Sequence, residues 1–284
     1  MMKTGLILEG GAYRGIFTTG VLKVLNKYGI SFDYIAGVSA GAGNIADYLT
    51  KRDDISRSYI SVMNKKNSLG FRQLIKSGYF LNIDSMAKEM MTLDDNDAAQ
   101  ILLNTPVDVE IVCSNCNTGR AEYLYERKSV RKLIEIGKAS CSIPILSKPI
   151  FINNIPYVDG SVTDAIPLKR ALTYKKCDKA VIIFTKNVDS KPTDYSKFPL
   201  MIRTYFHKKY PRMEYVLLHR TEEYQKELEY VREQEKKGRV FVIRPTAQGI
   251  HKFEKNITRL QDFYIHGIDT MERRMDELKD FLSE

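Results

Sequence analysis

The first fifty residues of the chain repeat one order twice: a short apolar run, a turn of small residues and an amphipathic run. The apolar runs are TGLILE (4–9) and FDYIAG (32–37). Runs of this length are typical of buried strands, while the apolar spacing over 16–29 is typical of a helix that ends at Gly29. Two strand-turn-helix units in succession predict an α/β fold with a parallel sheet and right-handed helical crossovers.

The first turn, GGAYRG (10–15), could bind either of two anions. Its glycine spacing is close to the dinucleotide-binding fingerprint, but its backbone N–H groups could instead hold the oxyanion of an acyl-transfer intermediate. A dinucleotide site also needs an acidic residue at the end of the second strand, where it binds the ribose hydroxyls. Asp33 lies at the beginning of that strand. The sequence therefore favours the oxyanion.

The second turn carries a serine between two glycines, in the order Gly37-x-Ser39-x-Gly41. Between a strand and a helix, this order predicts a nucleophile elbow, in which small neighbours permit a strained backbone that lifts the hydroxyl above the sheet. The carboxyl ends of parallel strands lie at the same edge of a sheet, so we expect the two turns to face one another. Ser39 is the candidate nucleophile.

A serine hydroxyl needs a base to become a good nucleophile. The histidines all lie in the charged last third of the chain, and none is in a glycine or aspartate turn: His207, His219, His251 and His266. Asp159 is in such a turn, followed by Gly160 and preceded by the apolar run IPYV. An aspartate acting directly on a serine needs a partly desolvated pocket that raises its basicity. A plain turn is the alternative for this dipeptide.

Four segments, in this order, resemble the bacterial patatin-like phospholipases. That family carries a G-G-G-x-R-G loop, a G-x-S-x-G nucleophile, a proline-containing AS segment and a D-G-G or D-G-A aspartate. The chain has GGAYRG (10–15), GVSAG (37–41), ASCSIP (139–144) and DGS (159–161), and the resemblance extends over residues 4 to about 185. Ala12 replaces the third glycine, which costs backbone freedom but keeps the N–H, and Ser161 adds a hydroxyl beside the aspartate.

The resemblance implies a three-layer α/β/α fold with a mainly parallel central sheet. It also implies hydrolysis of lipid or lysolipid carboxylic esters, of the phospholipase A or lysophospholipase type, by a Ser39–Asp159 dyad without cofactor or metal ion. Several further residues would serve this dyad: Gly10, Gly11 and Ala12 as the oxyanion hole, and Arg14, Gly37, Gly41 and Gly160 as supporting residues. Arg14 would brace the loop, add positive charge or form a salt bridge at the helix start. Two alternatives stay open: a soluble carboxylesterase or thioesterase with the same dyad, and a non-catalytic lipid-binding regulatory module.

The rest of the chain alternates strands and helices before becoming mainly helical. Residues 107–115 and 121–127 predict a strand hairpin, and the β-branched run at 179–186 predicts a further buried strand. We therefore expect a catalytic domain over residues 1–196. We expect residues 197–284 to form an appended, mainly helical region with one late strand at about 240–245.

The cysteines and the N-terminus bear on the cellular compartment. Cys113 and Cys116 have the spacing of a metal or redox pair, but no second pair accompanies them and no histidine precedes residue 207, so we expect ordinary buried thiols. The apolar patch near the N-terminus is too short for a signal peptide, and no window approaches the roughly 18 apolar residues of a membrane span. A cytoplasmic location with peripheral membrane contact is expected.

The formal net charge is +9, and one segment concentrates basic and aromatic residues. Residues 51–80 contain seven basic and two acidic residues among four aromatic ones. Such a stretch could meet anionic lipid head groups, in which case neutral residues at Lys65, Lys66, Arg72 and Lys76 would weaken vesicle binding. A solvated helix face is the alternative. No nucleic-acid-binding signature accompanies the charge, so nucleic acid is not an expected partner.

Overall fold

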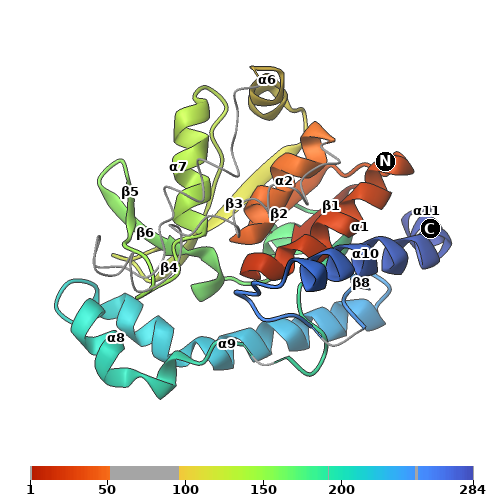
Figure 1. Ribbon diagram of the computed structural model, residues 1–284. Coiled ribbons are helices and arrows are strands. Elements are labelled where there is room, and N and C mark those ends of the chain that lie inside the picture. The colour runs from red at the N-terminus through yellow and green to blue at the C-terminus, as the bar shows by residue number, and fades with distance from the viewer. Residues whose placement is uncertain (1, 52–95, 191, 247–248, 284) are drawn as a thin grey trace.

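The computed structural model describes residues 2–51, 96–190, 192–246 and 249–283, and these form a central sheet between two layers of helices (Figure 1). The strands are β1 (Thr4–Leu8), β2 (Tyr34–Val38), β3 (Asp108–Asn115), β4 (Arg120–Leu124), β5 (Ile150–Ile152), β6 (Ile155–Asp159), β7 (Lys179–Ile183) and β8 (Val240–Ile243). The α-helices are α1 (Gly15–Lys27), α2 (Ala40–Thr50), α6 (Asn96–Asn104), α7 (Val130–Ser140), α8 (Pro199–Phe206), α9 (Pro211–Lys236), α10 (Ile257–Arg273) and α11 (Met275–Ser283).

The sheet is mainly parallel, as predicted. Its described strands follow the order β5-β6-β3-β2-β1-β7-β8, with β4 paired to β3 beside this path. Strands β3, β2, β1, β7 and β8 pair in parallel, whereas β4 and β6 run antiparallel to β3. The predicted hairpin is β3–β4, and both later apolar runs are strands, β7 and β8. The three-layer α/β/α expectation is confirmed.

Apolar side chains of alternate strand residues fill the two faces of the sheet. One core combines residues such as Leu6 and Leu8 with α1, α7, α10 and α11. The opposite core combines Ile7 and its neighbours with α9 and the segment 165–172. The alternation follows from the two-residue period of a strand, and burial on both faces explains why these strands are almost wholly apolar.

The last part of the chain is packed into the same core rather than standing apart. Strand β8 extends the sheet from β7, and α10 crosses α1 closely. A Cβ on Gly20 would lie 2.2 Å from the Tyr264 carbonyl oxygen, and one on Gly267 would lie 2.2 Å from the Phe17 carbonyl oxygen. Only glycine allows this approach, so α10 rests directly on the helix that follows the glycine loop.

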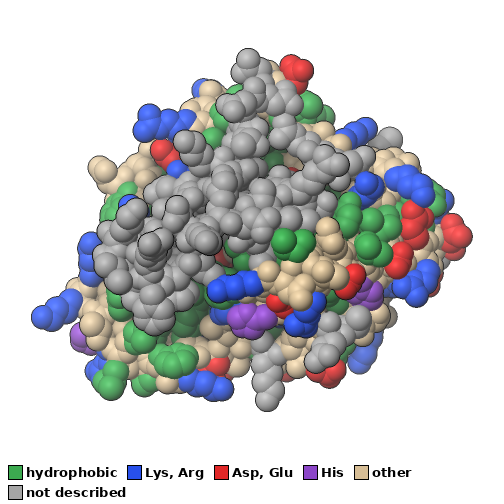
Figure 2. Space-filling view, viewed as in Figure 1, with side chains coloured by type: hydrophobic (Ala, Val, Ile, Leu, Met, Phe, Trp, Pro, Cys, Tyr) green, Lys and Arg blue, Asp and Glu red, His purple; other side chains and the backbone are tan. Residues whose placement is uncertain are grey.

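Helix α8 carries an exposed apolar surface, which lies at the lower left of Figure 2. Leu200 is 78% exposed, and Phe198, Met201 and Tyr205 are also exposed. Phe151 on β5 lies nearby, because it lines a common groove with Tyr205. We call these five residues the α8 patch. No helix in the described part of the chain is long and apolar enough to span a membrane.

The basic stretch predicted to meet lipid lies almost entirely outside the described residues. Lys51 ends α2 in a left-handed conformation, and Lys65, Lys66, Arg72 and Lys76 fall in the range 52–95 that the structure does not describe. The described residues resume with α6 at Asn96–Asn104.

Candidate active site

The pairing register of the strands places the predicted site residues at the same level of the sheet. Val38 on β2 is level with Val112 on β3, so Ser39 follows at the level of Cys113, and Cys113 is paired with Asp159 on β6. On the other side of β2, a Cβ on Gly10 would lie 2.8 Å from the Cβ of Ser39. The glycine turn, the serine turn and the aspartate turn therefore meet at one edge of the sheet, although long stretches of chain separate them.

Ser39 occupies the strained turn that the glycine spacing predicts. Its φ of 54° and ψ of −121° lie between β2 and α2, in a region that non-glycine residues rarely adopt. A Cβ on Gly41 would lie 2.3 Å from the Leu8 carbonyl oxygen, and one on Gly37 would lie 2.5 Å from the Gly41 carbonyl oxygen. Both flanking glycines are thus required by close packing. The Ser39 N–H donates to Ser140 Oγ at 2.8 Å, which fixes the turn to the end of α7.

The side chains of Ser39 and Asp159 form a direct hydrogen bond. Ser39 Oγ donates to Asp159 Oδ2 at 2.7 Å, and the other carboxylate oxygen accepts from the Ser161 N–H at 2.9 Å. Asp159 is only 3% exposed, and burial raises its pKa above the ordinary value, although hydrogen bonds from Ser161 and Ser39 oppose part of this effect. The arrangement provides a hydroxyl beside a carboxylate of increased basicity.

The turn that carries Asp159 is held tightly against β3. A Cβ on Gly160 would lie 2.1 Å from the Val112 carbonyl oxygen, so Gly160 has the supporting place that the motif predicts. The Asp159 N–H donates to the Ser142 carbonyl at 2.8 Å, and Ser114 Oγ donates to the Asp159 carbonyl at 2.8 Å. These bonds hold the backbone of the turn in place, so the Asp159 carboxylate is already oriented toward Ser39.

The glycine loop lines the same cavity as the two side chains. Gly10, Gly11 and Ala12 all face this cavity. Ala12 has a φ of 50°, in the region that favours glycine, so a side chain at this position costs about 1 kcal/mol. Thr185 Oγ1 donates to the Gly10 carbonyl at 2.9 Å and would clash with a Cβ on Gly11, which explains the retained glycine there.

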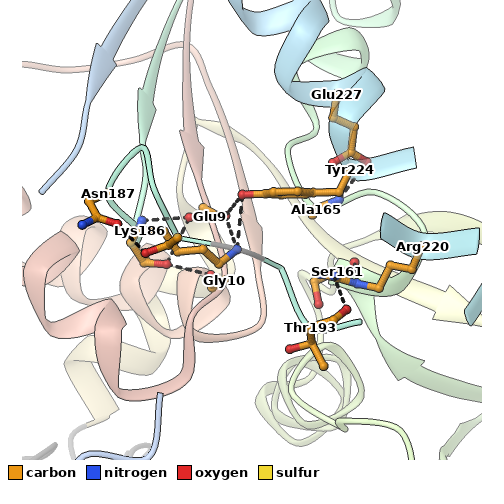
Figure 3. A network of polar contacts seen from close by, with 12 residues as sticks. Glu9, Gly10, Ser161, Ala165, Lys186, Asn187, Thr193, Arg220, Tyr224 and Glu227 are labelled. Atoms are coloured by element: carbon orange, nitrogen blue, oxygen red, sulfur yellow. Dashed lines mark hydrogen bonds and ion pairs between the residues drawn. The ribbon is translucent and has the colours of Figure 1, made fainter. Parts of the chain in front are cut away.

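A buried polar network anchors the base of this loop (Figure 3). Glu9 is 1% exposed and accepts hydrogen bonds from the Thr185 N–H, from Lys186 Nζ at 2.7 Å and from the Tyr224 hydroxyl at 2.7 Å. Burial acts to raise the pKa of Glu9, but the adjacent charge of Lys186 and these bonds outweigh it and lower the pKa. The network joins β1, β7 and α9 directly beneath Gly10.

None of the histidines lines the cavity among the described residues, which include all four. His207 pairs with Glu214, His219 with the Tyr215 carbonyl, and His266 with the Thr246 N–H. His251 accepts from the Phe253 N–H. Their positions agree with the choice of Asp159 as the base.

The cysteines are free thiols, as expected. Cys113 and Cys116 are buried, and burial raises the pKa of each, to about 12 for Cys116. Cys141 directly follows Ser140, whose hydroxyl bonds to the Ser39 N–H, and burial raises the pKa of Cys141 to about 12. A thiol of such low acidity is a neutral neighbour at this edge of the sheet.

Sequence reasoning missed several residues of the site: Glu9, Ser140, Thr185, Lys186, Arg220, Tyr224 and Lys252. Two of them carried a signal, since Glu9 and Lys186 are charged residues that directly follow buried strands. Arg220 and Lys252 carried none, because their sequence surroundings are ordinary charged helix and loop. Arg14 is predicted as a supporting residue; it forms no ion pair with a described residue, and its Nε is buried without a hydrogen-bond partner there.

Comparisons with known proteins agree with this geometry. A family model described as patatin-like phospholipase matches residues 6–172, and one described as a domain of unknown function (DUF6363) matches residues 210–283. The uncharacterized protein YjjU of Escherichia coli (strain K12) is 26% identical over 175 residues, which are 60% of this chain and 48% of that protein. Lysophospholipase nte1 of Aspergillus terreus is 49% identical over 49 residues, or 17% of this chain and 3% of that protein. The chain thus spans less than half the length of these relatives.

The fold is also similar to a solved structure. VipD from Legionella pneumophila superposes with a TM-score of 0.50 at 11% sequence identity, and the match covers 97% of this chain and 67% of that chain. At this identity the similarity concerns the fold alone, which extends through the helices of the last third of the chain.

Proposed function

The chain belongs to the patatin-like phospholipase family, a family of lipid acyl hydrolases, and from this premise we propose that it cleaves lipid carboxylic esters with Ser39 as nucleophile and Asp159 as base. The observation that carries the proposal is the 2.7 Å hydrogen bond from Ser39 Oγ to the buried Asp159 carboxylate, within the cavity that the glycine loop lines. The substrate is a phospholipid or a lysophospholipid.

The reaction proceeds in two acyl-transfer steps. Asp159 takes the proton of Ser39 as Oγ attacks the ester carbonyl, and the N–H groups of Gly10, Gly11 and Ala12 hold the resulting oxyanion. Collapse of the intermediate breaks the ester bond, and Asp159 returns the proton to the leaving alcohol. Asp159 then takes a proton from water as the water attacks the acyl group on Ser39, and it returns that proton to Ser39 Oγ when the fatty acid is released.

Product analysis separates this proposal from its alternatives. We expect the purified protein to release free fatty acid from phospholipid or lysophospholipid vesicles, as measured by mass spectrometry. A carboxylesterase or thioesterase would instead act on short soluble esters or thioesters and leave the vesicles intact. A lipid-binding regulatory module would bind vesicles and release nothing from any of these substrates.

Contact with a lipid surface has support in the α8 patch. Two of its side chains, Phe151 and Tyr205, line a groove together with Lys148 and Lys209. Apolar residues flanked by basic ones favour the interface of an anionic membrane. We expect Leu200→Gln to weaken sedimentation with anionic vesicles several-fold. Ile265→Gln, which changes a half-exposed residue on α10, is the matched control. Equal binding by both variants would contradict a lipid contact at α8.

A further inference from the structure

The active-site cavity is strongly basic. Among the described residues that line it are four cations, Arg14, Lys186, Arg220 and Lys252, and two carboxylates, Glu9 and Asp159. Of these six charged groups, the proposed reaction uses only the Asp159 carboxylate. The remaining excess of positive charge lies beside the nucleophile, where a reacting ester would be bound.

Two of the cations come from the last third of the chain, and backbone contacts hold both against the catalytic turns. Arg220 on α9 donates to the Ser161 carbonyl at 2.8 Å and to the Thr193 carbonyl at 3.3 Å, as Figure 3 shows. The Lys252 carbonyl accepts from the Tyr13 N–H at 3.1 Å, which ties its segment to the glycine loop. Lys252 Nζ donates to Thr193 Oγ1 at 3.4 Å. The region matched by a domain of unknown function thus completes the wall of the cavity.

Only one of the four cations is neutralised by an ion pair. Lys186 pairs with Glu9 at 2.7 Å, whereas Arg14, Arg220 and Lys252 form no ion pair with any carboxylate in the described ranges. Arg220 and Lys252 both contact Thr193, and Arg14 lines the same cavity, so the three cations form one cluster. Burial lowers the pKa of Lys252, and the charges of Arg14 and Arg220 lower it further, although Asp159 opposes part of this effect. A bound anion would relieve the repulsion among the three cations, since a cleft lined by one sign of charge attracts the opposite sign.

We propose that Arg14, Arg220 and Lys252 form a subsite that binds the phosphate of the substrate's head group, beside the ester that Ser39 attacks. The inference rests on the proposed function and assigns the recognition of the substrate's phosphate to these three residues. Guanidinium and ammonium groups are the strongest side-chain donors to phosphate. In a glycerophospholipid the phosphate is separated from the acyl esters by only a few bonds, so one small cavity accommodates both groups.

A binding experiment tests the subsite without turnover. We expect sn-glycerol 3-phosphate to bind the full chain in titration calorimetry, and Lys252→Met to weaken that binding about tenfold or more, as loss of a charge-assisted hydrogen bond does. Lys255→Met is the matched control, because Lys255 is exposed three residues along the same segment, and it should leave binding unchanged. Equal binding by the wild type and Lys252→Met, or no binding by either, would overturn the subsite.

A turnover experiment distinguishes a head group from a free phosphate. The ratio of kcat/KM for a lysophosphatidylglycerol to that for the monoacylglycerol with the same acyl chain should fall at least tenfold in Lys252→Met and stay constant in Lys255→Met. An unchanged ratio, with inorganic phosphate bound as tightly as glycerol 3-phosphate, would assign the subsite to free phosphate and overturn the head-group role. If the wild type hydrolyses neither ester, the proposed function fails, while loss of glycerol 3-phosphate binding in Lys252→Met would still support an anion subsite.

Discussion

Ser39→Ala is expected to lower kcat for ester hydrolysis by on the order of 10⁶, comparable to the loss of a nucleophile in other serine hydrolases. Ser39 Oγ donates to Asp159 Oδ2, and the hydroxyl adds little packing, so the substitution removes the attacking atom with a small effect on the fold. A fluorophosphonate probe followed by peptide mass spectrometry should label Ser39 in the wild type. Circular dichroism should show the same fold in the variant.

A neighbouring serine supplies the control for this experiment. Ser161→Ala changes a residue whose N–H donates to Asp159, yet it keeps that N–H and leaves the nucleophile in place. It should therefore keep the label. A label that persists in Ser39→Ala, or one found on Ser161, would show that the nucleophile has been assigned incorrectly.

Asp159→Asn is expected to lower kcat by about 10³–10⁴, because an amide cannot take the serine proton. Single replacements of the four histidines should each leave kcat within about tenfold. A histidine variant as impaired as the aspartate variant would indicate a triad in place of the dyad.

The pH dependence follows from the raised pKa of Asp159. The base acts in its ionised form, so kcat/KM should be constant at high pH and fall tenfold per pH unit below the raised pKa. The raised pKa of Asp159 affects activity and folding stability in opposite directions. Activity requires the ionised carboxylate, whereas the folded state is more stable when the carboxyl is protonated. A carboxyl whose folded pKa exceeds its unfolded pKa favours folding at low pH, and this contribution is lost as the pH rises through the folded pKa.

Because stability depends on the pKa of Asp159 in this way, a catalytic role of Asp159 can be distinguished from a structural one. Asp159→Asn carries no charge to desolvate, so near neutral pH it should be at least as stable as the wild type in urea unfolding while being inactive. A variant that loses activity together with stability would instead point to a structural role for the aspartate.

The sequence was sufficient to predict the turns that carry the site. Gly37, Ser39 and Gly41 restrict the backbone so strongly that their spacing predicts a local conformation, and the structure has Ser39 in a left-handed one. The parallel order of the first strands then brings the glycine loop to the same edge. Local backbone chemistry and one topological rule thus account for the position of Gly10 beside Ser39.

The basic wall of the cavity could not be predicted in this way. Arg220 and Lys252 reach the cavity because α9 and the segment after β8 pack against the catalytic turns, and that packing depends on contacts between residues far apart in sequence. A charge pattern on a long polar helix is the same whether the helix faces solvent or a substrate. The sequence predicted a mainly helical last region with one late strand, and the structure has that strand, β8, together with α10 in the common core.

The crossing of α1 and α10 at Gly20 and Gly267 affects the order in which the protein matures during its synthesis. About 250 residues separate these glycines, so at about 5–20 residues per second roughly 12–50 s pass between their emergence from the ribosome. Through that interval Phe17 lacks its ring contact with Phe263, and the glycine loop lacks its backbone bond to Lys252. We expect nascent chains that have not yet exposed α10 to carry Ser39 and Asp159 for many seconds without the helix that packs on α1 behind the glycine loop.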